Sequence, residues 1–232
     1  MKSWDKKQVL IFSLGGSLII PEQGIDTLFL KKFRGFILFL LKSGHKIVIV
    51  TGGGQTSKKY NLAATKISQV KNIDLDWLGI AATKLNAELL RVIFSQQAYS
   101  QVLDNPNQKI RTNKKLIIAS GWKPGCSSDL DAVLWANNFQ ARLLINLTDI
   151  DFVYEKDPDQ YPKARPIKQI NWADFRKIIG NQWSPRLSRP FGPPAARLAQ
   201  KNKLKVLILN GRKLDNLKNY LKGKNFKGTI IE

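Results

Sequence analysis

The sequence predicts an α/β fold, a three-layer α/β/α sandwich with a mostly parallel central sheet. Short apolar segments, typical of buried parallel strands, alternate with longer segments in which apolar residues recur at helical spacing. Two of the strand segments end in glycine turns that lead toward helices. The chain has 232 residues, of which 43% are hydrophobic, so it is large enough to bury a substantial core.

The first part of the chain shows this alternation most regularly. A continuous apolar strand at 8–14 ends in Gly15 and Gly16, and a helix at 26–43 has Gly44 as its C-cap. The following elements are also expected: a strand at 46–50, helices at 57–68 and 78–94, a strand at 115–120, a loop at 121–125, a helix at 129–138 and a strand at 142–147. Strands separated by helices in this way indicate a parallel sheet.

The pattern changes after Val153. Residues 155–194 are rich in Pro, Lys, Arg and Trp, with one weak helical stretch at 172–179. The alternation then resumes with a helix at 194–201, a strand at 206–209, a helix at 214–221 and a strand at 229–231. We therefore interpret the irregular stretch as an excursion within a single domain that spans residues 1–232.

The charge balance narrows the choice of partner. Lys and Arg number 38 against 17 Asp and Glu, a formal net charge of +21. Such a charge predicts an anionic partner (nucleic acid, an anionic membrane or a phosphorylated small molecule) or a solvated lysine-rich surface. The single Cys excludes an intrachain disulfide. No secretory signal is visible, and no apolar stretch approaches the ~20 residues of a membrane span, so we expect a cytoplasmic protein.

Two glycine turns, Gly15-Gly16-Ser17 and Gly52-Gly53-Gly54, follow predicted strands. Glycine lets backbone N–H groups approach a ligand closely, and a helix N-terminus behind such a turn favours an anion. Ligands of open α/β sheets lie at the carboxyl ends of the strands. Two such turns suggest two phosphorylated ligands that meet, although each turn alone could simply reverse the chain. Neither turn matches the P-loop or dinucleotide-binding pattern.

Two further strand ends carry polar residues. The segment 123–129 joins a strand to a helix, and its Ser127 and Ser128 hydroxyls could donate to phosphate while Asp129 caps the helix. Plain N-capping would explain Ser128 or Asp129, but not the whole cluster. The fourth strand runs into Thr148 and Asp149. Four strand ends thus place small, polar or acidic residues at the edge of the sheet where ligands bind.

Taken in order, these motifs resemble the amino-acid kinase superfamily, and most closely its archaeal-type uridylate (UMP) kinases. The resemblance covers nearly the whole chain and rests on the following segments: 13–17, 52–54 with 58–60, 76–80, 83–87, 124–129, 151–158, 193–196 and 228–230. It implies an amino-acid kinase-like fold with an acceptor lobe at about 1–147 and an ATP lobe at about 148–232. It also implies ATP-dependent phosphorylation of UMP to UDP with Mg²⁺, and a homo-oligomer, commonly a hexamer.

The resemblance also implies roles for individual residues. The catalytic group would comprise Asp129, Lys58, Gly15 and Gly16. The ATP site would comprise Ser13, Leu14, Gly15, Gly16, Ser17, Gly54, Lys58, Thr148, Asp149, Tyr154 and Asp157. The UMP site would comprise Gly53, Asp76, Trp122, Lys123, Pro124, Gly125, Cys126, Ser127 and Ser128. No residue is assigned as a metal ligand.

The chain departs from the family pattern at several of these positions. Ser13 stands where many members carry Lys, although the archaeal-type enzymes commonly lack this Lys too. Gly192 precedes Pro193 where an Asp-Pro pair is usual, and Phe152 replaces a usual Gly. Lys58 replaces a usual Arg and offers a point charge instead of a bidentate fork. Cys126 stands where His or Gln is common, and we interpret it as a small buried residue.

Three alternatives to a UMP kinase stay open. One is another small-molecule kinase of the superfamily; an isopentenyl phosphate kinase would usually place a His after the glycine triplet, where this chain has Gln55 to Lys58. Another is a non-catalytic relative that binds nucleotides or oxyanions, which the departures at Gly192 and Phe152 keep open. A third is a nucleic-acid-binding role, which only the net charge favours, since no such motif is present.

Overall fold

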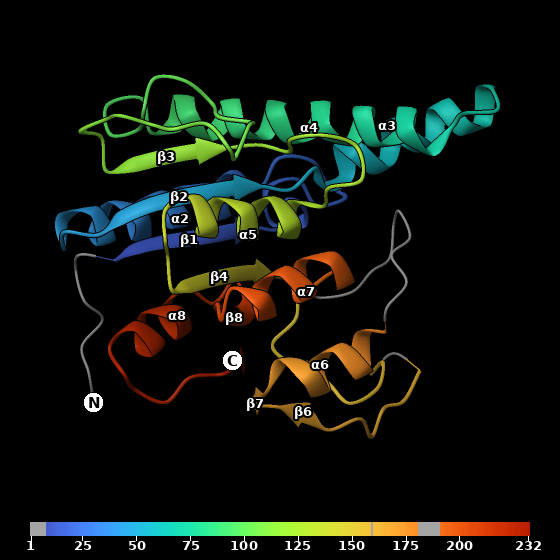
Figure 1. Ribbon diagram of the computed structural model, residues 1–232. Helices are drawn as coiled ribbons and strands as arrows, with labels where there is room; N and C mark the ends of the chain where they lie inside the picture. Colours follow the sequence, from blue (N-terminus) through green and yellow to red (C-terminus); the bar gives the residue numbers. More distant parts are fainter. Residues whose placement is uncertain (1–7, 159, 181–190) are drawn as a thin grey trace.

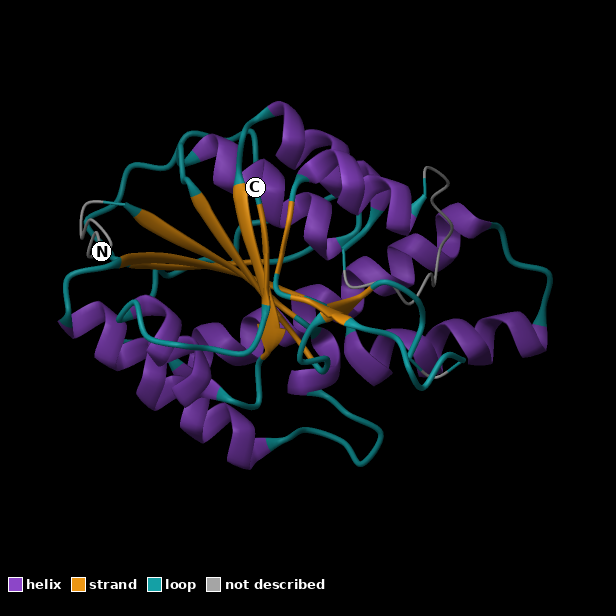
Figure 2. Ribbon diagram, turned by 90° about the horizontal axis from the view of Figure 1, so that it is seen from below, coloured by secondary structure: helices purple, strands orange, loops and turns teal. Residues whose placement is uncertain are grey.

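The computed structural model describes residues 8–158, 160–180 and 191–232. A twisted sheet lies between two layers of helices, which confirms the predicted three-layer sandwich (Figures 1 and 2). In spatial order its strands are β3 (Leu116–Ala119), β2 (Lys46–Thr51), β1 (Val9–Leu14), β4 (Leu143–Thr148), β8 (Lys205–Asn210), β9 (Thr229–Ile231) and β7 (Gln169–Ile170). Neighbouring strands run parallel except β8 and β9.

The helices divide between the two faces of the sheet. The first layer contains α1 (Gly16–Ile19), α2 (Thr27–Lys42), α4 (Asn72–Ile93) and α8 (Leu214–Leu221). The second contains α5 (Ser128–Asn138), α6 (Trp172–Ile179) and α7 (Pro193–Lys201). The remaining helix, α3 (Gly54–Ile67), has no buried residue and packs mainly against α4 (Figure 1).

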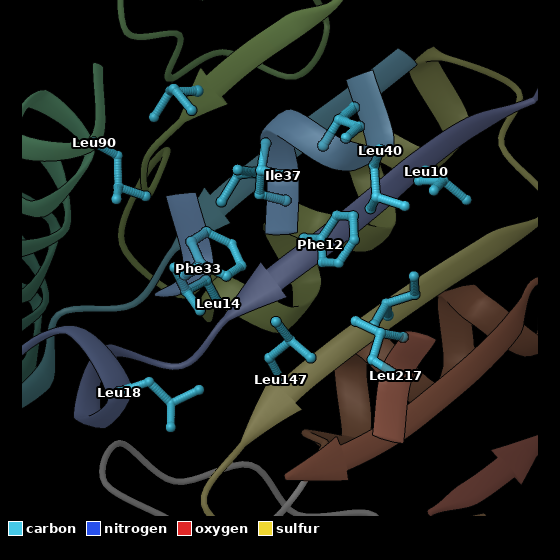
Figure 3. Close-up of a cluster of buried hydrophobic side chains, with 14 of the residues drawn as sticks. Leu10, Phe12, Leu14, Leu18, Phe33, Ile37, Leu40, Leu90, Leu147 and Leu217 are labelled. Carbon is cyan, nitrogen blue, oxygen red and sulfur yellow. The ribbon is translucent and has the colours of Figure 1, made fainter. Parts of the chain in front are cut away.

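The alternation of side chains along the strands builds a core on each face. Leu10, Phe12 and Leu14 of β1 join the first cluster, while Ile11 joins the second. Figure 3 shows Phe12 and Leu14 in the first cluster with Phe33 and Ile37 of α2. Each such side chain contributes about 1.5–3 kcal/mol when fully buried. The same alternation turns Ser13 toward the α5 face, which decides its role in the site.

The observed elements differ from the predicted ones where the apolar pattern is short or interrupted. The four-residue helix α1 is too short to show a period. Helix α4 begins at Asn72, six residues before the predicted start, because the exposed Ile73 and Trp77 obscure its apolar face. Helix α3 begins at Gly54 rather than at 57. The predicted irregular segment contains the expected helix α6 at 172–179, but also the strand β7 and the strand β6 (Pro166–Ile167), which forms a ribbon with β5 (Val153–Tyr154) just before the segment. Residues 181–190 of that segment lie outside the described residues.

The strand order places the site. From β1 the chain proceeds through β2 to β3 on one side, whereas β4 and β8 extend the sheet on the other. The order therefore reverses between β1 and β4, and the carboxyl ends at such a switch point form a crevice for ligands. Because β4 pairs with both β1 and β8, the two predicted lobes share one continuous sheet. Within the described ranges, no helix combines the length and apolar character that crossing a membrane requires.

Candidate functional site

The two glycine turns pack directly against each other at the switch point. The Gly15 N–H donates to the Leu147 carbonyl at the end of β4 (2.9 Å), and the Gly52 N–H donates to the Leu14 carbonyl (2.9 Å). A Cβ added to Gly16 would lie 2.6 Å from the Cα of Gly54, so only glycine fits there. The structure thus joins the two predicted phosphate turns, Gly15–Gly16 and Gly52–Gly54, into one continuous backbone surface, here called the glycine floor. Ligands bound to the two turns would therefore be neighbours.

The glycine triplet leads into the N-terminus of α3. Gly53 is the N-cap residue, and Gly54 has a left-handed backbone with φ of 62°. The first turn of α3 has neither a capping side chain nor an acidic residue, which suits an anion. The buried Asn86 amide on α4 donates to the carbonyls of Gly52 (2.8 Å) and Gly53 (3.3 Å) and holds the triplet in place.

Asp129, on the first turn of α5, faces the ends of β1 and β4. Its Oδ1 accepts hydrogen bonds from the Ser13 hydroxyl and the Asn146 amide, each 3.1 Å long. Its carboxylate also accepts from the backbone N–H of Gly192. Burial raises the pKa of Asp129 to about 6, while these three donors act in the opposite direction by favouring the charged form. Asp129 is therefore a carboxylate at neutral pH and protonates in mild acid.

The loop from Gly121 to Ser127, here called the acceptor loop, is anchored at several points. The Gly121 N–H donates to the Thr83 hydroxyl (2.8 Å), and the Gly125 N–H donates to the Asp76 carboxylate (2.8 Å). The Lys123 ammonium lies 4.0 Å from the centroid of the Trp122 ring, a cation–π contact. The structure thus brings Asp76, on α4, to the loop that contains most of the other predicted UMP residues, whereas Gly53 precedes α3 and Ser128 begins α5.

The end of the acceptor loop corrects the predicted helix cap. The Ser127 hydroxyl accepts from the Leu130 N–H (3.2 Å), so Ser127 caps α5 and neither Ser128 nor Asp129 does. Asp129 is instead free to face the strand ends, because it lies inside the helix. Cys126 is half-buried, not buried as predicted, because it lies in the loop before α5. Burial and then the nearby Asp131 raise the pKa of its thiol, so it stays protonated at neutral pH.

Polar side chains also join the ends of β1, β4 and β8. Asp149 accepts hydrogen bonds from the hydroxyls of Thr148 (3.0 Å) and Ser17 (3.5 Å). The Asn210 amide donates to the Asp149 carbonyl (3.0 Å). This cluster lies beside the glycine floor, where the sequence places the ATP residues.

Other predicted residues are less closely integrated. Tyr154 lies on the β5–β6 ribbon and is half-buried, whereas Asp157 is exposed in the turn that follows. Lys58 is exposed on α3, and it makes no ion pair within the described part of the chain. Its ammonium is thus available to a ligand.

Sequence reasoning missed several polar residues that shape the site. Asn146 lies in a buried strand, and that mismatch in an apolar segment was the available signal. Arg212 pairs with Asp26 (2.6 Å), and Lys213 pairs with Asp151 (2.6 Å), so the turn after β8 is tied to both neighbouring loops. These two cations follow a strand end as the predicted residues do, but no motif singles them out.

Comparisons with known proteins show the family to which this chain belongs. Residues 8–210 match the "Amino acid kinase family". The chain is 31% identical over 227 residues to a uridylate kinase of Sulfurisphaera tokodaii, covering 96% of this chain and 98% of that protein. It is 30% identical over 226 residues to a uridylate kinase of Pyrococcus abyssi, with 96% and 99% covered. The chain belongs to the amino acid kinase family, and the resemblance to its archaeal-type uridylate kinases is confirmed.

Solved structures agree with this assignment. The fold superposes on a crystal structure of uridylate kinase from Archaeoglobus fulgidus with a TM-score of 0.81, at 25% identity and with 97% of this chain and all of that chain covered. A UMP kinase structure from Bacillus anthracis gives a TM-score of 0.79 at 18% identity, with 97% and 96% covered. The second likeness shows the shared fold alone.

Proposed function

We propose that this protein is a kinase that transfers the γ-phosphoryl group of ATP to UMP and yields UDP. One observation carries the proposal: two glycine turns pack backbone to backbone at the switch point of the sheet, with Asp129 beside them. Phosphoryl transfer depends on positioning and charge stabilisation more than on covalent help from the protein. Full-length relatives named uridylate kinase support the choice of acceptor.

Each group of residues would contact a different part of the two nucleotides. The Gly15 N–H already donates to the Leu147 carbonyl, so the backbone N–H of Gly16, with Ser13, Leu14, Gly15 and Ser17 around it, would bind the transferring phosphate. Gly53 and Gly54 at the start of α3 would bind the acceptor and donor phosphates, and Lys58 would add positive charge. The acceptor loop and Asp76 would hold UMP, whereas Thr148, Asp149, Tyr154 and Asp157 would hold ATP. Asp129, fixed by Ser13 and Asn146, would orient the reacting groups.

The side chains present fit a magnesium ion that is brought by the nucleotide. Within the described residues, no three carboxylate, imidazole or thiol groups come together as a metal cage. Mg²⁺ in such sites usually keeps several waters and binds substrate phosphates plus one or two carboxylates. Asp149, an exposed carboxylate that receives hydroxyl hydrogen bonds, would meet it. When bound, the ion supplies charge neutralisation on the phosphate oxygens.

Assembly and location are part of the same proposal. Helix α3 has no buried residue, and Tyr60, Leu62 and Ile67 on it are 63%, 55% and 85% exposed. Large apolar side chains exposed on a helix without a buried residue support a homo-oligomer, with a hexamer as the specific expectation. A cytoplasmic location fits a consumer of ATP. The net charge of +21 would speed capture of nucleotides at low salt without a specific nucleic-acid partner.

The test is an acceptor panel. The purified protein is incubated with ATP, Mg²⁺ and either UMP, CMP, dTMP or isopentenyl phosphate, and ADP release is followed. We expect turnover selective for UMP, and its loss in Asp129→Ala with nucleotide binding retained. Turnover with another acceptor would identify a different small-molecule kinase. Binding of ATP or UMP without any turnover would identify a non-catalytic relative.

A further inference from the structure

Asp131 is a buried carboxylic acid that the proposed transfer of phosphate does not use. It lies on the first turn of α5, two residues after Asp129, and none of its surface is exposed. Its Oδ2 accepts one long hydrogen bond, 3.4 Å, from the backbone N–H of Trp122. Its Oδ1 has no hydrogen-bond partner among the residues that the structure describes.

This arrangement is costly for the fold. A buried carboxyl group with one oxygen unsatisfied loses hydration that a single long hydrogen bond does not replace. An apolar residue of similar size would serve the core at least as well, because replacing buried polar groups by packed apolar ones is often neutral or stabilising. Stability of α5 therefore does not explain why Asp131 is present.

The one contact that Asp131 makes points to the acceptor loop. Two carboxylates on different helices hold that loop by its backbone. Asp131 on α5 accepts from the Trp122 N–H, and Asp76 on α4 accepts from the Gly125 N–H. The Lys123 ammonium lies over the ring of Trp122, whose backbone is the first of these anchor points. Fixing the backbone at Trp122 therefore fixes where the indole ring and the ammonium point.

We propose that Asp131 is a positioning residue that holds the Trp122–Lys123 pair in the orientation in which the acceptor nucleotide meets it. The inference rests on the proposed function only in taking UMP as that nucleotide. Removal of the carboxyl group should therefore weaken binding of the acceptor nucleotide without markedly lowering the stability of the fold. Replacement by Val removes the unsatisfied oxygen and also removes the acceptor of the Trp122 N–H; these two effects on stability oppose each other, so the fold should not be markedly weakened. The loop, however, loses one of its two carboxylate anchors.

The experiment compares wild type with Asp131→Val and Asp131→Asn, which keeps a side-chain oxygen for the Trp122 N–H. UMP affinity is measured by calorimetry without ATP, affinity for a non-hydrolysable ATP analogue is measured in parallel, and melting temperatures are recorded. The Val variant should bind UMP roughly five- to tenfold more weakly, the equivalent of one lost hydrogen bond. Its affinity for the ATP analogue and its melting temperature should not fall markedly. The Asn variant should recover most of the UMP affinity.

Hydrogen exchange of the amides at 121–127, measured without ligand, separates this inference from the proposed function. Faster exchange in the Val variant than in the Asn variant supports the anchor, whatever the acceptor is. If wild type fails to bind UMP while this difference persists, the proposed function fails and the positioning role stands. Unchanged exchange overturns the inference, as does a Val variant that melts earlier and binds both nucleotides more weakly, because that result indicates a merely structural residue.

Discussion

Ser13 and Asn146 occupy paired positions on the adjacent parallel strands β1 and β4, and both donate to the same oxygen of Asp129. Their side chains face α5 because alternate residues of a strand share a face. Both donors are neutral, so they stabilise the Asp129 carboxylate without cancelling its charge. The register of two central strands thereby sets the position of the residue we propose as catalytic.

Replacing Asn146 by Val should shift the pH dependence of activity. The Asn146 amide favours the charged form of Asp129, so its removal raises the pKa of Asp129 above about 6. If turnover needs the carboxylate, the acid limb of the kcat profile should move to higher pH by about half a unit to one unit, the equivalent of one hydrogen bond. Activity above pH 8 should change least. An acid limb that stays in place would contradict the role assigned to Ser13 and Asn146. The Ser13→Ala variant, which removes the other donor to Asp129, should shift the acid limb in the same direction.

The Gly192→Asp variant should fold normally and shift the acid limb of the kcat profile to higher pH. A Cβ at this position would come no closer than 3.7 Å to the Ser127 hydroxyl, and the φ of −72° suits any residue. The new side chain could cap α7, which has no capping side chain. The added carboxylate, next to the backbone N–H that Asp129 accepts from, should raise the pKa of Asp129. The isosteric Gly192→Asn is the control without charge; equal pH profiles for the two variants would refute the electrostatic explanation.

The order of strands and helices could be predicted because buried parallel strands have a strong local signature. The residues at 8–14 and 46–50 are predominantly apolar, and glycine follows the end of each strand. The ribbon of Val153–Tyr154 with Pro166–Ile167 could not be predicted, because each two-residue strand forms only through its pairing with the other. The early start of α4 was hidden for a related reason: Trp77 is 50% exposed and does not follow the apolar face of its helix.

The site was predictable in its backbone parts and less so in its side-chain contacts. Glycine turns are visible in sequence because few other residues adopt their geometry. The contact of Gly125 with Asp76 joins residues 49 positions apart, and that of Ser13 with Asp129 joins residues 116 apart. Such pairings follow from strand register and helix packing. The resemblance to known kinases could suggest the residues, but not which atoms meet.

The contact between the glycine turns gives a prediction on stability. Gly16→Ala would force a methyl group into the backbone of Gly54, and overpacking of this kind typically costs about 1–3 kcal/mol. The turns would also separate, so turnover should fall strongly. Gly35→Ala is the matched control: it lies inside α2, and among the described residues no atom beyond its own helix turn and chain neighbours lies within 4 Å of its added Cβ. It should stabilise the protein by about 0.5–1 kcal/mol. Denaturant unfolding measures both, and equal effects would disprove the close approach.

Asp131 should make stability depend on pH. Burial, with the nearby Asp129, raises its pKa to about 7, although the Trp122 N–H acts in the opposite direction. A native pKa above the unfolded value means that the native state holds the proton more tightly, so stability falls as pH rises from about 4 to 7 and then levels off. The Asp131→Asn variant has no carboxyl group at this position, so it does not lose stability in this way as the pH rises. Its stability relative to wild type should increase over that range by up to about 4 kcal/mol, at about 1.36 kcal/mol per pKa unit. Urea unfolding at pH 4 and 8 measures it; a constant difference would show that Asp131 titrates normally.

The exposed face of α3 should govern assembly. Leu62 and Ile67 are exposed on α3, a helix with no buried residue in its own chain, and a stable contact between copies would bury them. The double variant Leu62→Ser, Ile67→Ser should therefore lower the oligomeric mass seen by light scattering on a sizing column. Leu28→Ser is the control, because Leu28 is 73% exposed but lies on α2. It should leave the mass unchanged. A double variant with the wild-type mass would place the contact between copies elsewhere, and a wild type that runs as a monomer would refute the oligomer itself.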